Sequence, residues 1–178
     1  MLTLILGGAR SGKSRFAQGL VLRAAHVVYV ATLAPGDDAE MQERLARHRA
    51  DRPAAWHTVE APLALAEAVE SAAGEADAVI VDCLTLWLSN LSWEHRAMGA
   101  DSLEEAVKSQ LRRVGDAARR CHVVLVSNEV GYGIVPESPV ARAFRDAHGR
   151  MNQLAAEMAD SVILVVAGLP VHVKGAAR

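Results

Sequence analysis

Cysteine and aromatic residues are scarce in this sequence. The two cysteines, Cys83 and Cys121, lie in or beside apolar runs, and their spacing matches neither a disulfide framework nor a metal-binding pair. This scarcity argues against a disulfide-stabilised secreted protein, so we expect two reduced, buried thiols in a cytoplasmic protein. Aromatic residues make up 4% of the chain. We expect Trp87 and Trp93 to pack in the core or at a subunit interface.

The sequence also has no large excess of charge of one sign and no long apolar run. The formal net charge is −2, which argues against a nucleic-acid-binding protein and against attraction to an anionic membrane. No apolar run approaches the ~20 residues of a membrane span, and the N-terminus lacks the residue order of a signal peptide. The 178 residues contain no repeat and no linker, so we expect one domain, residues 1–178, that buries its own core.

Short apolar runs alternate with amphipathic stretches along the chain. The runs predict strands at Leu2–Leu6, Val27–Ala31, around Thr58 and Val59, Ala78–Cys83, His122–Asn128, Ser161–Gly168 and Pro170–Lys174. The stretches between them predict helices at Lys13–Ala25, Ala39–Arg49, Pro62–Ala73, Leu84–Leu91, Ser102–Arg120 and Val140–Ala159. Apolar strands separated by helices indicate an α/β fold, with a mostly parallel sheet and helices on both faces. In such sheets, ligands bind beyond the carboxyl ends of the strands.

The first predicted strand leads directly into the stretch Gly7-Gly8-Ala9-Arg10-Ser11-Gly12-Lys13-Ser14, which fits the phosphate-loop pattern G-x-x-x-x-G-K-[ST]. Glycines let successive backbone N–H groups point at one anion, and the helix that follows adds its positive end. Lys13 supplies a cation for the β- and γ-phosphates, and Ser14 offers a hydroxyl to Mg²⁺. Because strand, motif and helix occur in the required order, the loop predicts a P-loop NTPase fold that binds a nucleoside triphosphate.

Two acidic residues at the carboxyl ends of predicted strands are candidates for a role beside this loop. Asp82 ends the strand AVIVD, where the acid that helps to hold Mg²⁺ lies in P-loop proteins. It is also placed to cap the helix that follows. Glu129 comes directly after the strand HVVLVSN, and its position is compatible with a catalytic role or with an ordinary loop acid.

The phosphate loop by itself leaves several protein classes open. A switch GTPase is disfavoured because the sequence has no N-K-x-D segment to read guanine and no D-x-x-G after a strand. A DNA-dependent ATPase is disfavoured by the balanced charge and by the lack of a basic stripe. A small-molecule kinase fits, and the loop from Glu129 to Pro139, which contains glycine and proline, can line its substrate pocket.

The stretch MQERLARHRADRP, residues 41–53, adds a feature that a plain kinase does not need. On helical spacing, Met41, Leu45 and His48 share a face, and arginines flank that face on both sides. In one interpretation, His48 is a packed core histidine beside a solvated arginine face. In the other, the guanidiniums suppress the protonated imidazole and attract a polyphosphate. His48 then attacks phosphorus and forms a covalent phosphoramidate.

Five stretches together resemble the bifunctional adenosylcobinamide kinase / adenosylcobinamide-phosphate guanylyltransferase family. They are GGARSGKSRFAQ, YVAT, ERLARHRADRPAAWHTVEAP, VDCLTLWLSNL and VSNEVGYGIVPESPVARAFRDAHGRMNQ, and the similarity runs from about Leu2 to Lys174. The phosphate loop is common to many proteins, whereas H-R-x-x-R-P-x-x-W-x-T-x-E and SNEVGYGIVP are far more specific. The resemblance implies a RecA-like sheet and homotrimers with sites near the subunit boundaries.

The resemblance also implies two reactions and a set of site residues. ATP or GTP phosphorylates adenosylcobinamide, and GMP from GTP then passes through a histidine, implied to be His48, to adenosylcobinamide phosphate. The products are adenosyl-GDP-cobinamide and pyrophosphate, and we expect Lys13 and Mg²⁺ to serve both reactions. Further nucleotide contacts are implied at Thr32, Leu33, Ala34, Arg49, Ala50, Asp51, Arg52, Glu60 and Asp82. Some family members have a second histidine at Arg47, and some have glutamate at Asp82.

Two alternatives remain open at this point. In the first, the chain is a P-loop kinase of another small alcohol that lacks the guanylyl step, and His48 is structural. In the second, the chain is a non-catalytic switch that responds to bound nucleotide.

Overall fold

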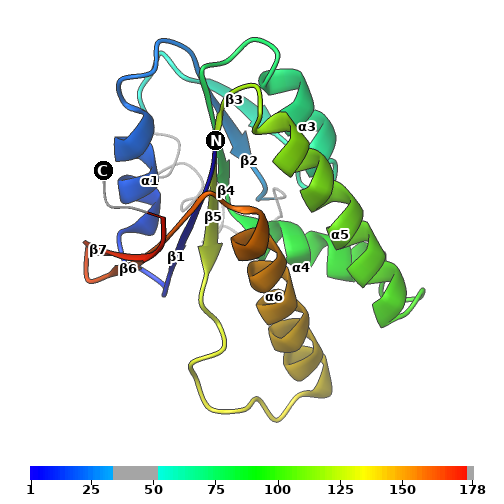
Figure 1. Ribbon diagram of the computed structural model, residues 1–178. Coiled ribbons are helices and arrows are strands. Elements are labelled where there is room, and N and C mark those ends of the chain that lie inside the picture. The colour runs from blue at the N-terminus through cyan, green and yellow to red at the C-terminus, as the bar shows by residue number, and fades with distance from the viewer. Residues whose placement is uncertain (34–51, 176–178) are drawn as a thin grey trace.

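The computed structural model describes residues 1–33 and 52–175 (Figure 1). Within these residues, seven strands form one sheet in the order β3-β2-β4-β5-β1-β6-β7. The strands are β1 Leu2–Gly7, β2 Val27–Ala31, β3 His57–Glu60, β4 Ala78–Asp82, β5 His122–Asn128, β6 Ser161–Val166 and β7 Leu169–Lys174. The helices are α1 Lys13–Val21, α3 Leu65–Ala72, α4 Leu84–Glu94, α5 Ala100–Ala117 and α6 Pro139–Met158. The predicted helix Ala39–Arg49 lies outside the described residues.

Parallel pairing brings the ends of the strands to a common edge. Strands β1 to β6 run parallel to one another, and β7 pairs with β6 in the antiparallel direction. The register places Gly7 beside Asn128 and Ala31 beside Asp82. The carboxyl ends of β1, β2, β4 and β5 therefore meet at one edge. The α/β fold with a mostly parallel sheet is confirmed.

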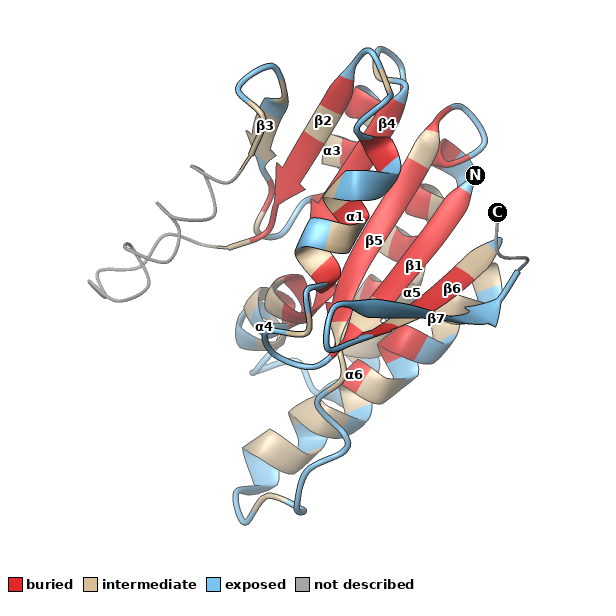
Figure 2. Cartoon of the chain, turned by 90° about the vertical axis from the view of Figure 1, so that its left-hand side faces the viewer, coloured by how far each residue is buried: buried red, intermediate tan, exposed pale blue. Residues whose placement is uncertain are grey.

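Successive residues of the central strands point to opposite faces of this sheet. In β1, Leu4 belongs to a core shared with α3, α4, α5 and α6, whereas Ile5 belongs to a second core beneath α1. Both side chains are fully buried. Figure 2 shows α1 in front of the sheet, with α3, α5 and α6 behind it. Helices thus cover both faces, as the apolar strands indicated.

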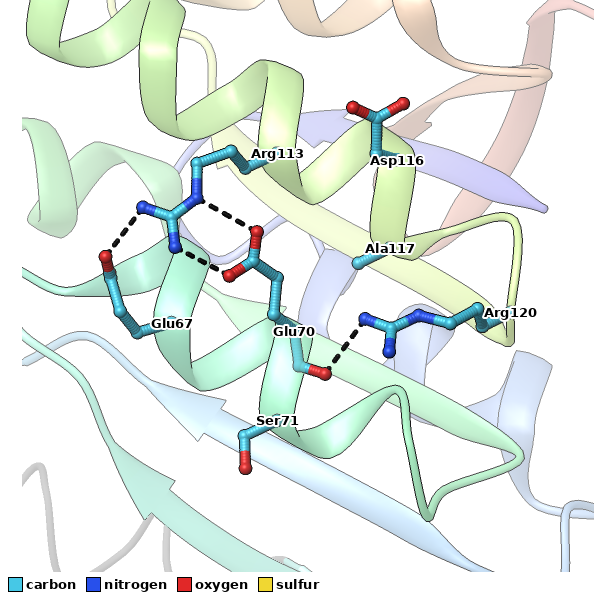
Figure 3. A pocket seen from close by; sticks show the side chains of 7 residues that line it. All are labelled: Glu67, Glu70, Ser71, Arg113, Asp116, Ala117 and Arg120. Atoms are coloured by element: carbon cyan, nitrogen blue, oxygen red, sulfur yellow. Dashed lines mark hydrogen bonds and ion pairs between the residues drawn. The ribbon is translucent and has the colours of Figure 1, made fainter.

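An ion-pair cluster joins α3 to α5 (Figure 3). Arg113 donates to Glu70 from Nε at 2.9 Å and from Nη2 at 2.6 Å, and its Nη1 donates to Glu67 at 2.6 Å. These hydrogen bonds from the guanidinium hold the pKa of both carboxyls below the usual range. Because the pairs are exposed, they add little to stability and mainly fix how the two helices face each other.

The start of α3 differs from the prediction. The sequence predicts a helix that opens at Pro62, whereas α3 begins at Leu65. The carbonyl groups ahead of it bond to side chains of α4 instead. Asn90 Nδ2 donates to the Pro62 carbonyl at 3.0 Å, and Trp87 Nε1 donates to the Leu63 carbonyl at 3.0 Å. The prediction of a helix opened by proline is therefore wrong, because these tertiary contacts hold the segment in a non-helical conformation.

The scarce residue types occupy different environments. Cys83 and Cys121 are free and buried, as expected. Trp87 is fully buried, which confirms its core position, whereas Trp93 is 69% exposed. A core position for Trp93 is therefore wrong. The Arg96 guanidinium lies 4.3 Å from the centroid of the Trp93 ring, and an interface role for Trp93 stays a prediction. Among the described residues, no helix combines the length and the apolar character of a membrane span.

Trp87 provides a test of how α4 packs. The Trp87→Ala substitution removes a fully buried ring and the donor to the Leu63 carbonyl. We expect it to lower the free energy of unfolding by about 3–5 kcal/mol. The Trp87→Phe control keeps most of the ring volume and loses chiefly the hydrogen bond, so we expect a loss of about 1–2 kcal/mol. Urea denaturation of both variants measures the difference. Equal losses would contradict the packing described above.

Candidate active site

The phosphate-loop motif forms a tight turn between β1 and α1, as its spacing predicts. Arg10 and Gly12 have left-handed backbone conformations, with φ of 57° and 92°. Ser11 N–H donates to the Gly8 carbonyl at 3.2 Å, which closes the turn. Gly168 N–H, from the turn between β6 and β7, donates to the Ser11 carbonyl at 2.8 Å. The loop is therefore held both from within and by a neighbouring strand connection.

The side chains of this loop bring a cation and an unpartnered hydroxyl together. Lys13 is only 9% exposed, and its Nζ donates to the Gly8 carbonyl at 3.2 Å. Ser11 Oγ is buried and has no hydrogen-bond partner among the described residues. This hydroxyl is enclosed beside Gly7 and close to the strand connection after β6, so it packs inside the loop. Ser14 lies in the first turn of α1 and is half-buried.

Asp82, the predicted Mg²⁺ ligand at the end of β4, is the first of a series of side chains in contact. The Tyr29 hydroxyl donates to Asp82 Oδ2 at 2.6 Å. The Arg52 guanidinium lies over the Tyr29 ring, with Cζ 3.7 Å from the centroid, and its Nη1 donates to Thr58 Oγ1 at 3.3 Å. Burial and the Asp82 charge raise the pKa of Tyr29, so the phenol keeps its proton and orients the carboxylate.

The structure excludes one of the two interpretations of Asp82. The N-cap of α4 is Cys83, and no side chain caps the helix, so the prediction that Asp82 caps α4 is wrong. The carboxylate accepts from Tyr29 instead. Tyr29 itself is a contact that the sequence analysis missed, because β2 and β4 must be paired before the two side chains can be seen to meet.

Thr32 and Leu33 follow β2 at the same edge. Thr32 is fully buried, and its Oγ1 donates to the Cys83 carbonyl at 2.7 Å and accepts from Cys83 N–H at 2.8 Å. Asn90 Nδ2 donates to the Thr32 carbonyl at 2.8 Å. The Thr32 hydroxyl is therefore engaged with the backbone that follows β4. Its position fixes the ends of two strands relative to each other.

The sheet order places the described site residues along one edge. β3 ends at Glu60, which is exposed and pairs in register with Ala31. Thr32 follows β2, Asp82 ends β4, and β5 separates β4 from the strand that leads into the phosphate loop. Five predicted site residues lie outside the described residues, and they are Ala34, His48, Arg49, Ala50 and Asp51.

A buried polar network behind β5 is a further feature that sequence reasoning missed. Thr85 Oγ1 lies 3.0 Å from His148 Nε2, and Ser127 Oγ donates to Asn152 Oδ1 at 2.7 Å. Burial lowers the pKa of His148 to about 4, so its imidazole is neutral. The spacing of His148 and Asn152 is a detectable signal, because residues four apart on a helix share a face. Their partners on β5 and α4 are not readable from spacing.

Comparison with known proteins identifies relatives over almost the whole chain. The family model described as "Cobinamide kinase / cobinamide phosphate guanyltransferase" matches residues 3–173. The bifunctional adenosylcobalamin biosynthesis protein CobP of Pseudomonas aeruginosa is 46% identical, over 98% of this chain and 98% of that protein. The bifunctional adenosylcobalamin biosynthesis protein CobU of Escherichia coli is 41% identical, over 98% of this chain and 100% of that protein.

Solved structures show the same fold at low sequence identity. A prototypical ATPase from the type III secretion system of pathogenic bacteria has a TM-score of 0.55 at 15% identity, over 96% of this chain and 56% of that chain. The type III secretion system ATPase EscN of enteropathogenic Escherichia coli has a TM-score of 0.55 at 13% identity, over 93% of this chain and 43% of that chain. These likenesses support the RecA-like P-loop fold.

Two neighbouring glycines test the geometry of the loop. A Cβ at Gly7 would lie 2.5 Å from Ser11 Oγ and 2.7 Å from the Val165 carbonyl, whereas one at Gly8 would meet nothing within 4 Å. We expect Gly7→Ala to lower the free energy of unfolding by about 1–3 kcal/mol, because a backbone carbonyl must shift. We expect Gly8→Ala, the matched control, to change it by less than about 0.5 kcal/mol. Thermal and urea unfolding measure both, and equal effects would contradict this geometry.

Proposed function

The chain belongs to the cobinamide kinase / cobinamide phosphate guanyltransferase family, and from this membership we propose how one phosphate loop serves two reactions. The chain is a bifunctional enzyme of cobalamin biosynthesis that has both activities. The two alternatives, a kinase without the guanylyl step and a non-catalytic switch, are set aside by this membership.

The proposed kinase reaction takes place at the phosphate loop. A hydroxyl oxygen of adenosylcobinamide attacks the γ-phosphorus of ATP or GTP. The bond from that phosphorus to the bridging oxygen breaks, and the nucleoside diphosphate leaves. Lys13 neutralises charge on the β- and γ-phosphates, and the loop N–H groups that do not close the turn hold them. The buried position of Lys13 and the left-handed backbone of Arg10 and Gly12 support this placement.

The proposed guanylyl transfer consists of two displacements at the α-phosphorus of GTP. A ring nitrogen of His48 attacks, the bond to the bridging oxygen breaks, and pyrophosphate leaves. A phosphate oxygen of adenosylcobinamide phosphate then attacks the histidine-bound phosphorus. The P–N bond breaks, and adenosyl-GDP-cobinamide forms. The family's guanylyltransferase activity supports a covalent intermediate, and the arginines that flank His48 in the sequence would stabilise the developing charge.

The donor atoms beside the loop fit Mg²⁺. Ser14 offers a hydroxyl, and Asp82 offers a carboxylate whose Oδ2 is oriented by the Tyr29 hydroxyl. Mg²⁺ prefers such oxygen donors and takes only one or two protein ligands where substrate phosphates complete its shell. When bound, Mg²⁺ would neutralise phosphate charge. Aspartate at this position reaches one methylene less far than the glutamate of some family members.

The remaining nucleotide contacts are proposed between the end of β2 and the end of β3 in the sequence. They are Thr32, Leu33, Ala34, Arg49, Ala50, Asp51, Arg52 and Glu60. Support comes from Arg52, whose guanidinium is held over Tyr29 beside Asp82. Thr32 would act through the backbone geometry that its buried hydroxyl fixes rather than by a side-chain contact.

A homotrimer in the cytoplasm is proposed as the working form. Exposed apolar side chains gather in and just after the loop that follows β5, where Tyr132, Ile134 and Val140 are mostly solvent-accessible. Such side chains are better suited to a subunit boundary than to free solvent. The free, buried thiols of Cys83 and Cys121 support a reducing compartment.

The guanylyl-histidine intermediate is tested by mass. Wild-type protein incubated with GTP and Mg²⁺ is expected to gain one GMP, located on His48 by peptide mapping. The His48→Ala variant is expected to gain none, because the nucleophile is gone, while it retains most of its kinase activity.

His57→Ala is the matched control, because His57 is exposed at the start of β3 and has no proposed role. This control should take up GMP as the wild type does. GMP that stays covalently attached to the His48→Ala variant would overturn the assignment of the nucleophile.

A further inference from the structure

Glu129 is the first residue after β5, and β5 lies directly beside the phosphate-loop strand. The register pairs Asn128 with Gly7, the last residue of β1. Glu129 N–H extends this pairing by donating to the Gly7 carbonyl at 3.1 Å. The backbone of Glu129 is therefore fixed at the point where β1 turns into the loop. Asp82 lies one strand farther away, at the end of β4.

The side chain of Glu129 is half-buried and has one described partner, Asn152 of α6. Asn152 Nδ2 lies 3.4 Å from Glu129 Oε1 and donates to the Asn128 carbonyl at 3.0 Å. Asn152 is itself buried, and its Oδ1 accepts from Ser127 Oγ at 2.7 Å. A buried amide with both ends engaged can turn very little, so it presents its N–H₂ group toward Glu129 in a fixed direction.

The rest of the buried polar network keeps this region neutral. Asn128 N–H donates to Thr85 Oγ1 at 2.9 Å, and Thr85 lies 3.0 Å from the neutral His148. Glu129 therefore carries the charge at the outer end of a chain of neutral groups. Burial raises the pKa of its carboxyl, which makes the carboxylate a better proton acceptor than a fully solvated one.

We propose that Glu129 is the general base of the kinase reaction and that Asn152 is its positioning residue. As the hydroxyl oxygen of the cobinamide substrate attacks the γ-phosphorus, its proton passes to a carboxylate oxygen of Glu129. The O–H bond breaks while the O–P bond forms, and the nucleoside diphosphate carries away the electron pair of the broken P–O bond. This role rests on the proposed use of the phosphate loop by the kinase reaction.

The two activities differ in their need for this base. An alcohol must lose a proton as it attacks, and a positioned base is worth about 10²- to 10⁴-fold in rate. A neutral imidazole attacks through a lone pair that it already carries. A phosphate dianion attacks through an oxygen that is already deprotonated. Glu129 should therefore matter to the kinase reaction and not to either half of the guanylyl transfer.

The full-length Glu129→Gln variant tests this selectivity. Glutamine keeps the size and the contact with Asn152 but accepts no proton. Three rates are compared with wild type: phosphorylation of adenosylcobinamide, covalent uptake of GMP from GTP, and transfer of that GMP to adenosylcobinamide phosphate. We expect the kinase kcat to fall about 10²- to 10⁴-fold, with little change in KM, and both guanylyl rates to stay within about twofold.

Two further variants complete the experiment. Glu75→Gln, in the exposed turn after α3 and away from every proposed site residue, should leave all three rates unchanged. Glu129→Asp retains a base and should recover part of the kinase kcat that Glu129→Gln loses.

An unchanged kinase kcat in Glu129→Gln, or an equal fall in all three rates, would overturn the role of Glu129. The proposed histidine intermediate is judged separately by whether the wild-type protein takes up GMP, so the failure of one proposal is distinguishable from the failure of the other.

Discussion

The backbone register between β1 and β5 is the constraint on which the site depends. It runs from Leu2 beside Val123 to Gly7 beside Asn128, and it sets where the phosphate loop begins. A slip of one residue would turn Leu4 and Ile5 toward the wrong cores. Because both side chains are fully buried on opposite faces, the hydrophobic cores enforce this register.

The two reactions make different demands on this edge of the sheet. In the proposed mechanism both need a triphosphate held by the loop, but their nucleophiles differ in kind. An alcohol must lose a proton as it attacks, whereas a neutral imidazole and a deprotonated phosphate oxygen attack without losing one. The fold places two acids there in different environments. Asp82 is hydrogen-bonded to Tyr29 at the end of β4, whereas Glu129 lies beside β1 and is tied to a neutral buried network. The two acids can therefore have separate proposed roles: Asp82 would bind a metal ion, and Glu129 would accept a proton.

Local patterns were predictable from the sequence, and long-range contacts were not. The phosphate loop and most strands depend on short spacings, so they were predicted correctly. The Tyr29–Asp82 hydrogen bond joins residues on different strands, and only the pairing of β2 with β4 brings them together. The late start of α3 and the exposure of Trp93 likewise follow from how α4 packs. His48 lies outside the described residues, so its proposed role rests on the family resemblance and on the reactivity of an imidazole flanked by arginines.

In the proposed mechanism, one phosphate loop holds the triphosphate for both activities. The most direct measurement is inhibition by the β,γ-imido analogue of ATP, determined for the kinase reaction and for covalent guanylylation by GTP. A shared loop predicts a single inhibition constant, with competition against the nucleotide in both cases. Guanylylation that proceeds at the uninhibited rate while the analogue saturates the kinase site would contradict the claim.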